Sequence, residues 1–225
     1  MFDRRDPPSY AAAAGWTLLF VFALFELALG PRLEHLTLLG LAVPDAALRL
    51  PLQIAAALAL VRVALRWREI GLLPLTQWTA TEGLYFAQIV IAAGAVFAVL
   101  FLRAVPPGAW QAIGTVMLTQ MLWGFYQELM YRGLLQTELT RRFGMLWGAL
   151  IANLAFTFGP LHFYYFGAGA ALPDGNAVIV TAIFAIGAFF AVIFARTRNL
   201  WIVGVFHGIG NLFTNGGPEI RSLLG

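Results

Sequence analysis

Few residues of this 225-residue chain could do chemistry, and those that could gather in three short groups in its second half. The groups are Gln127-Glu128-x-x-x-Arg132, Phe158-x-x-x-His162 and His207-x-x-x-Asn211. They contain a carboxylate, a guanidinium, two imidazoles and two amides, which hold charge, move protons or donate hydrogen bonds. What they can do depends on the segments that hold them.

The composition predicts that these groups lie inside a membrane. Hydrophobic residues make up 60% of the chain, charged residues only 11%, and the mean hydropathy is +0.80. A soluble domain of this size could not hide so much apolar surface, whereas lipid suits it as a solvent. The 14 basic residues are all arginine and are scattered, so no basic face indicates nucleic-acid binding. The chain has no cysteine, which excludes disulfides and thiolate chemistry.

Apolar segments divide the chain into about seven predicted spans, given that a span needs about 20 residues. They are 11–30, 48–66, 84–103, 112–138, 146–166, 177–196 and 199–215. We therefore predict an all-α fold, a polytopic transmembrane helical bundle. Residues 1–111 are expected to form N-terminal membrane helices and interfacial loops, 112–215 the helical core with all three groups, and 216–225 a short C-terminal tail.

Arginine counting sets the predicted orientation, because cytoplasmic loops are enriched in basic residues. With a cytoplasmic N-terminus, nine arginines lie on the cytoplasmic side and four on the other, and Arg132 lies within a span. We expect an integral protein of the bacterial inner (cytoplasmic) membrane with its N-terminus in the cytoplasm.

Glu128 and Arg132 are four residues apart, so both side chains project from one face of their helix. A charged side chain within a membrane helix is costly and needs a partner. Two interpretations stay open for the pair: a salt bridge that fastens two helices together, or part of a functional site.

Pro160 predicts how His162 is held. Proline removes a backbone donor and so frees the carbonyl of Phe156, one turn earlier in the helix. Lipid cannot satisfy that carbonyl, so a polar cavity or a helix contact is expected beside His162. Taken alone, His162 could also be a satisfied core histidine.

The last predicted span combines polar and small residues. His207 and Asn211 share one helix face, and Gly204 with Gly208 forms a small-xxx-small pattern that lets another helix come close. Asn211 alone could serve only helix–helix hydrogen bonding. Counting about 1.5 Å per residue, all three groups fall at a similar depth, in the middle to outer part of the bilayer, which predicts one shared site.

The three groups, in this order, resemble the motifs of the CPBP intramembrane proteases, a family that includes the CAAX prenyl endopeptidases of the Rce1 type. The family pattern is Glu-Glu-x-x-x-Arg, Phe-x-x-x-His and His-x-x-x-Asn, each on a membrane helix. The resemblance covers residues 112–215 and implies a CPBP-like core with glutamate-dependent peptide hydrolysis inside the membrane.

The resemblance also implies a role for each residue. Glu128 is expected to be catalytic, His162 to orient or deprotonate water, and His207 and Asn211 to donate hydrogen bonds to the oxyanion, a contribution of roughly 3–4 kcal/mol per donor. Gln127 and Arg132 are expected to support them. The expected partners are a membrane-embedded or lipid-proximal protein substrate and the lipid bilayer, with no nucleic acid.

No cofactor is expected. Glutamate with two histidines is a possible zinc set, but no His-Glu-x-x-His occurs and the third histidine, His35, lies in the first loop. We therefore predict no metal.

Gln127 departs from the family pattern, which has a glutamate there. An amide can position water but cannot accept its proton. Three explanations are open: Glu128 is the base, the chain is an inactive relative that still binds a membrane segment, or the glutamine is an engineered trap. We favour an active protease. The alternatives are a membrane peptide-binding or immunity protein and a transporter, against which the chain lacks a repeat between its halves.

Overall fold

The computed structural model describes residues 69–102, 105–159, 162 and 174–224, with isolated positions before them. Within this part, the chain is helical apart from turns and a two-residue antiparallel ladder of β1 (Thr37–Leu38) and β2 (Leu41–Ala42). The all-α prediction is confirmed at this level. The predicted span 11–30 lies outside the described residues, and the described positions of 48–66 are helical.

Among the residues that the structure describes, two helices are long and apolar enough to cross a membrane: Ala80–Leu100 and Ala177–Thr197. The first is α4 (Ala80–Leu100), which follows the short 3-10 helix η1 (Leu75–Gln77). A capping box starts α4, because the Thr79 side chain accepts from the Glu82 amide and the Glu82 carboxylate accepts from the Thr79 amide. The larger count of about seven spans remains a prediction.

A long helical segment carries the first chemical group. It runs through α5 (Trp110–Glu128), the π-helix η3 (Leu129–Gln136) and α6 (Thr137–Phe158). Gly144 breaks α6 with φ 83° and ψ 167°, a conformation that side chains disfavour, so the two predicted spans 112–138 and 146–166 are separated there. The helix α6 ends at Phe158, and the predicted end of the span at 166 lies outside the described residues.

The C-terminal part contains α7 (Asp174–Thr197), α8 (Leu200–Asn211), the π-helix η5 (Leu212–Gly216) and α9 (Gly217–Leu224). The predicted tail 216–225 is therefore mostly helical. Ile220 of α9 is fully buried against Phe101, Ile113 and other apolar side chains.

The turn between α7 and α8 is fastened to the residues before η1. Arg198 Nη2 donates to the Glu69 carbonyl at 2.7 Å, and the Leu200 amide donates to the Gly71 carbonyl at 2.8 Å. Gly71 has φ 84°, and a Cβ there would lie 2.8 Å from the Arg198 carbonyl oxygen. Burial lowers the pKa of Arg198 to about 10, because the charged form loses its hydration. The hydrogen bond from the Leu200 amide to the Gly71 carbonyl fixes where α8 begins.

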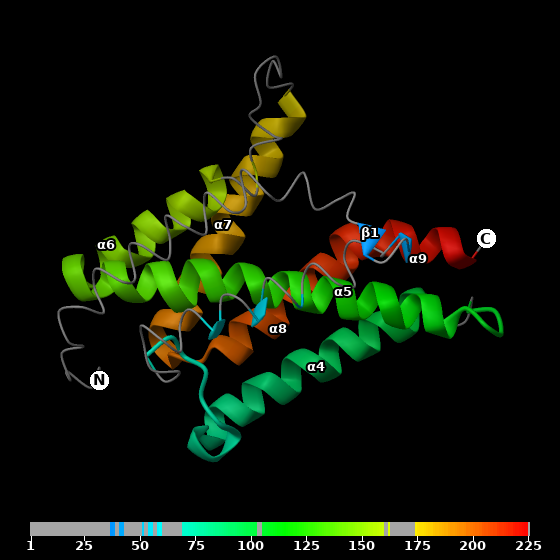
Figure 1. Ribbon diagram of the computed structural model, residues 1–225, viewed down its shortest axis with the longest axis horizontal. Helices are drawn as coiled ribbons and strands as arrows, with labels where there is room; N and C mark the ends of the chain where they lie inside the picture. Colours follow the sequence, from blue (N-terminus) through cyan, green and yellow to red (C-terminus); the bar gives the residue numbers. More distant parts are fainter. Residues whose placement is uncertain are drawn as a thin grey trace.

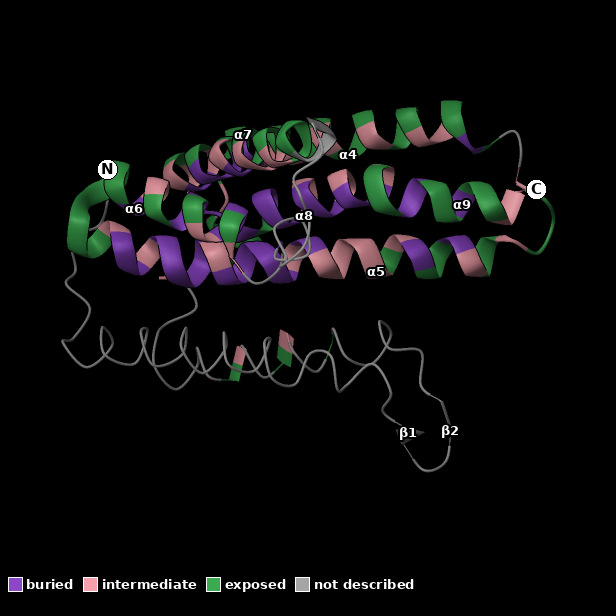
Figure 2. Cartoon of the chain, turned by 90° about the horizontal axis from the view of Figure 1, so that it is seen from above, coloured by how far each residue is buried: buried purple, intermediate pink, exposed green. Residues whose placement is uncertain are grey.

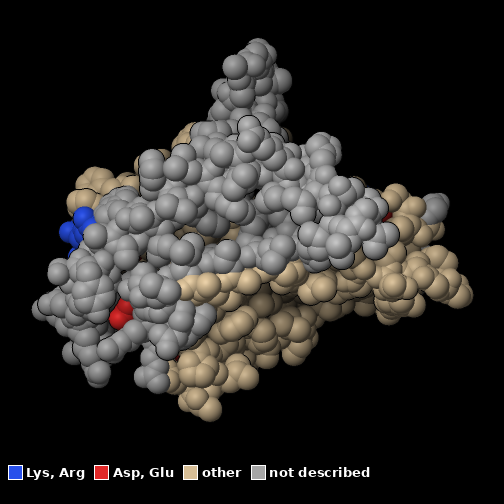
Figure 3. Space-filling model, viewed as in Figure 1, with Lys and Arg blue, Asp and Glu red and all other residues tan. Residues whose placement is uncertain are grey.

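The core of the molecule is the crossing of α5 and α8. Figure 1 shows α8 passing behind α5, with α4 below and α7 rising above. Buried residues concentrate on these two helices and on η3, whereas the outward faces of α4 and α7 are exposed (Figure 2). Where Figure 3 colours the residues, the charged side chains that show lie toward the two ends of the molecule.

Glycines allow α5 and α8 to approach. A Cβ on Gly208 would lie 2.7 Å from Met121 Cα, and one on Gly204 would lie 2.8 Å from the Phe125 ring. A Cβ on Gly124 would collide with the backbone of Gly208. The small-xxx-small pattern of α8 thus brings a neighbouring helix close, as its sequence predicts.

Replacing Gly208 with alanine is expected to destabilise the fold by about 1–3 kcal/mol, because the added methyl group forces the two backbones apart. The measurement is the melting temperature of the purified protein in detergent. Gly210→Ala, on the same helix, is the matched control, because a Cβ on Gly210 would contact nothing within 4 Å. A Gly208→Ala variant with the same melting temperature as Gly210→Ala would contradict the close approach of α5 and α8.

Large apolar side chains cover the outside of the described helices. On α4, Ile91 and Val99 are 71% and 80% exposed, and on α7 Val178 is 71% exposed. Exposed apolar surface of this extent is unfavourable in water and suits contact with lipid.

Candidate active site

Glu128 lies at the centre of the site and is already bonded through both carboxylate oxygens. Its Oε2 accepts from Arg132 Nε at 3.2 Å, and its Oε1 accepts from His207 Nδ1 at 2.7 Å. The side chain is completely buried. Glu128 therefore joins the first chemical group on α5 to the third on α8, and its two oxygens are occupied by neighbouring side chains.

Arg132 ties this carboxylate to two further helices. Its Nη2 donates to the Gly187 carbonyl of α7 at 2.9 Å and approaches Asn153 Oδ1 of α6 at 3.5 Å. The guanidinium also lies over the Phe156 ring, with Cζ 5.1 Å from the ring centre, which is a cation–π contact. Arg132 is fully buried, so these contacts replace its hydration.

His207 is oriented from both faces. Its Nδ1 bonds Glu128, the Phe190 ring of α7 stacks on it at 4.9 Å, and the Phe156 ring meets it edge-on at 5.7 Å. A carboxylate only accepts hydrogen bonds, so His207 Nδ1 must carry the proton. The other ring nitrogen, Nε2, is the one left for chemistry.

His162 is oriented by the carbonyl that the sequence predicts to be free. The Phe156 carbonyl accepts from His162 Nδ1 at 2.7 Å, and the two rings also pack edge-to-face at 5.0 Å. A carbonyl cannot donate, so neutral His162 carries its proton on Nδ1 and presents a lone pair at Nε2. Since Phe156 contacts both histidines, their rings belong to one cluster.

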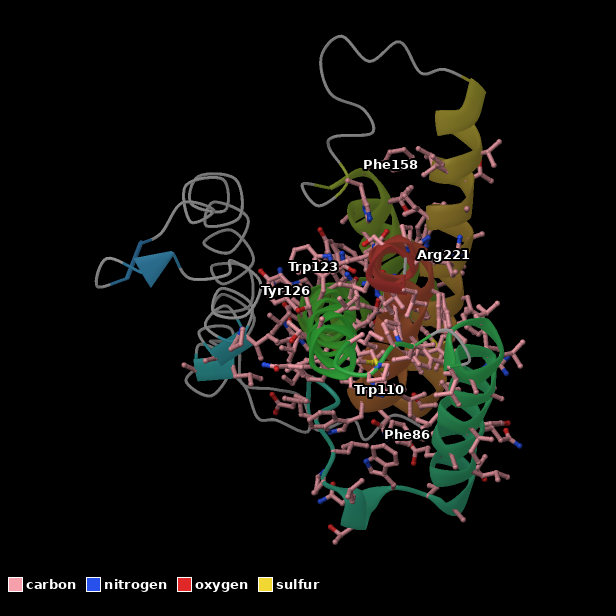
Figure 4. All side chains as sticks on the ribbon, turned by 90° about the vertical axis from the view of Figure 1, so that its right-hand side faces the viewer. Phe86, Trp110, Trp123, Tyr126, Phe158 and Arg221 are labelled. Carbon is pink, nitrogen blue, oxygen red and sulfur yellow. The ribbon has the colours of Figure 1, made fainter. Side chains whose placement is uncertain are left out.

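Gln127 and Asn211 form the second link between α5 and α8. Asn211 Nδ2 donates to Gln127 Oε1 at 3.5 Å, a long contact, and both side chains are buried. Tyr126, two residues before Glu128, points away from the site. It stacks with Trp123 on the side of α5 that is away from α7 (Figure 4). Gln127 thus faces Asn211, while Glu128 faces His207.

Both α5 and α8 change to π-helix directly after a motif residue. Glu128 is the last residue of α5 before η3, and Asn211 is the last residue of α8 before η5. Short π segments inside α-helices are frequent at functional sites. Thr137, the first residue after η3, donates from Oγ1 to the Arg132 carbonyl at 3.2 Å.

The sequence analysis misses three residues of this neighbourhood, Asn153, Gly187 and Phe190, and for Phe156 it finds the carbonyl but not the ring. Asn153 could have been found as a lone amide in an apolar span, where polar side chains are unusual. It donates to the Phe184 carbonyl at 3.0 Å. The motif phenylalanine, Phe158, is 48% exposed, and it is the Phe156 ring that packs on His162.

A metal site would need several histidine or carboxylate side chains close together. Across the residues that the structure describes, no three histidine, aspartate or glutamate side chains lie close enough to hold a metal ion together. His35 lies outside that part of the chain.

Comparison with protein families finds one match. Residues 108–213 match the family described as type II CAAX prenyl endopeptidase Rce1-like. This part of the chain is therefore an Rce1-like domain, and the resemblance to the CPBP intramembrane proteases is confirmed for it. The family is one of membrane-embedded proteases. Comparisons with curated proteins and with solved structures gave no significant match.

Proposed function

We propose that this protein is an intramembrane endopeptidase that hydrolyses a peptide bond in a membrane-associated protein. The observation that carries the proposal is the pair of oriented imidazoles. Each is bonded through Nδ1, His162 to a backbone carbonyl and His207 to a buried carboxylate, and both contact Phe156. The two imidazoles lie within one cluster and are of the residue type that most often performs acid–base catalysis.

In this mechanism His162 is the general base. The sequence pattern alone allows either His162 or Glu128 in this role. Neutral His162 Nε2 takes a proton from water while the oxygen attacks the scissile carbonyl carbon. The resulting oxyanion receives hydrogen bonds from Asn211 Nδ2 and from protonated His207 Nε2. The C–N bond then breaks as His162 returns the proton to the leaving amine, which balances the hydrolysis.

Glu128 acts in the proposal as a positioning residue. Because its oxygens already accept from Arg132 and His207, it holds the His207 ring with Nδ1 toward the carboxylate. Gln127 holds Asn211 and lends a neutral acceptor to water beside it.

The test is cleavage in proteoliposomes of purified protein. The family description makes a farnesylated peptide with a CaaX end the first probe, and a peptide anchored by a membrane helix the second. Mass spectrometry detects the released fragment. We expect cleavage of one of them by wild type and none by the His162→Ala/His207→Ala double variant. Cleavage by wild type should persist in strong chelator; loss that zinc restores would overturn the metal-free mechanism.

Gln127→Glu is expected to raise the cleavage rate by about 10- to 100-fold. A carboxylate beside Asn211 can accept the proton of water, which an amide cannot, and a positioned general base contributes roughly 10²–10⁴-fold. Initial rates at saturating probe give the comparison. Gln111→Glu, at an exposed position of α5, controls for the added charge; an equal gain there, or no gain at Gln127, would contradict the explanation.

A second function is favoured by Gln127 alone: a membrane protein that holds a peptide without cutting it. In that case the wild-type protein would bind the probe peptide without cleaving it, and only the Gln127→Glu variant would cleave it. The His162→Ala/His207→Ala double variant would keep the biological activity of the wild type.

A further inference from the structure

A buried polar ladder joins η3 to α7 behind the site. Arg132 Nη2 donates to the Gly187 carbonyl, and Gln136 Nε2 donates to the Ala191 carbonyl, each at 2.9 Å. The two donors are four residues apart and so are the two acceptors, so the ladder has two successive rungs. Arg132 and Gln136 are almost completely buried, at 0% and 1% exposed.

Each rung has one buried atom that lacks a hydrogen-bond partner within the described part of the chain. These atoms are Arg132 Nη1 and Gln136 Oε1. A buried polar atom left without a partner costs about 1–3 kcal/mol, and more for a charged group. Arg132 Nη1 can only donate and Gln136 Oε1 can only accept, so the two unmet needs are complementary.

The two unmatched atoms come from neighbouring positions on one face of η3. Arg132 and Gln136 are four residues apart, and the carbonyls that they reach, on Gly187 and Ala191, are one turn apart on α7. One molecule that accepts from Arg132 Nη1 and donates to Gln136 Oε1 would make two hydrogen bonds of about 2.9 Å each. The π-helical geometry of η3 helps, because residues four apart point more nearly in one direction when each turn holds more residues.

The chemistry of the position selects the ligand. It must both accept and donate, which excludes a cation beside the guanidinium. An anion is disfavoured because Glu128 already pairs with Arg132, and Gln136 Oε1 would repel it. Water meets both needs, and buried waters typically bridge polar groups of this kind.

We infer that a water molecule binds inside the bundle between Arg132 Nη1 and Gln136 Oε1. The water completes the hydrogen bonding of Arg132 and so helps to fix the cation that holds Glu128. This water site is independent of the proposed protease function, because it rests on the two unmatched atoms and exists whether or not the chain cleaves peptides.

The experiment is an experimental structure of the full-length wild-type protein in lipid, at a resolution that shows ordered water. The expected result is a density peak within hydrogen-bond distance of both Arg132 Nη1 and Gln136 Oε1. A map in which the two atoms bond each other directly, or in which a side chain of this protein fills the position, would overturn the inference. The wild-type map decides the matter without any variant.

Variants then test which atom holds the water. Gln136→Met keeps the length of the side chain but removes the acceptor, so the peak should be lost, whereas Gln136→Glu keeps an acceptor and should retain it. Gln111→Met, at an exposed position, controls for the substitution itself and should leave the peak unchanged. A peak that persists at full occupancy in Gln136→Met would remove Gln136 from the site.

Discussion

Arg132→Met is expected to lower the free energy of unfolding by about 3–5 kcal/mol, because it leaves the carboxylate of Glu128 buried without its cation. Glu128 is completely buried, so water cannot take the place of the guanidinium. The same substitution removes the hydrogen bond to the Gly187 carbonyl and the contact over Phe156. A methionine fills similar volume but replaces none of these interactions.

Thermal unfolding in detergent, followed by tryptophan fluorescence, measures this loss. Arg142→Met is the matched control: Arg142 also pairs with a glutamate four residues earlier, but it is 34% exposed, and Glu138 keeps its bond to Arg141. It should melt close to wild type, since exposed pairs contribute little. The double variant Arg132→Met/Glu128→Gln should recover part of the stability. Equal melting of Arg132→Met and Arg142→Met would show that the buried pair is not needed.

His162→Ala is expected to reduce the cleavage rate by about 10²–10⁴-fold, the contribution of a positioned general base. The alanine removes Nε2, the proposed proton acceptor. In wild type the Phe156 carbonyl holds the proton of His162 on Nδ1, so Nε2 carries the lone pair. The loss should lie in kcat more than in KM, because proton transfer belongs to the transition state rather than to substrate binding.

His162→Gln separates base chemistry from positioning. Glutamine can hydrogen-bond water but cannot accept its proton at neutral pH, so it should be as slow as alanine. Gln111→Ala on the exposed face of α5 should retain the wild-type rate. A His162→Gln variant with most of the wild-type activity would rule His162 out as the base and return that role to Glu128.

The sequence predicts the helices because hydrophobicity is a local signal. Composition and apolar runs locate α4, α7 and α8, and proline chemistry predicts that the Phe156 carbonyl needs a partner. Helical spacing places Glu128 and Arg132 on one face, and the glycines of α8 predict its close neighbour. Each of these inferences needs only the chain within a few residues of the feature.

Other features depend on contacts between distant parts of the chain, which one sequence does not record. Nothing local states that His207 takes one oxygen of Glu128 while Arg132 takes the other. The ladder to Gly187 and Ala191 uses backbone carbonyls, which every residue has, so their side chains carry no signal. The π segments arise where hydrogen bonding adapts to packing, and the apolar runs that contain them look like ordinary α-helix.

The two π segments also bear on how this chain tolerates changes in length. A π turn holds one residue more than an α turn, so η5 is equivalent to an α-helix carrying an inserted residue just after Asn211. Deleting one residue within η5 would remove the extra residue and let α8 continue into α9 as a regular helix, without the rotation of about 100° that a deletion in a regular helix causes. The side chain of Ile220 would then keep its apolar neighbours. A one-residue deletion is therefore expected to be better tolerated in η5 than within α8 or α9.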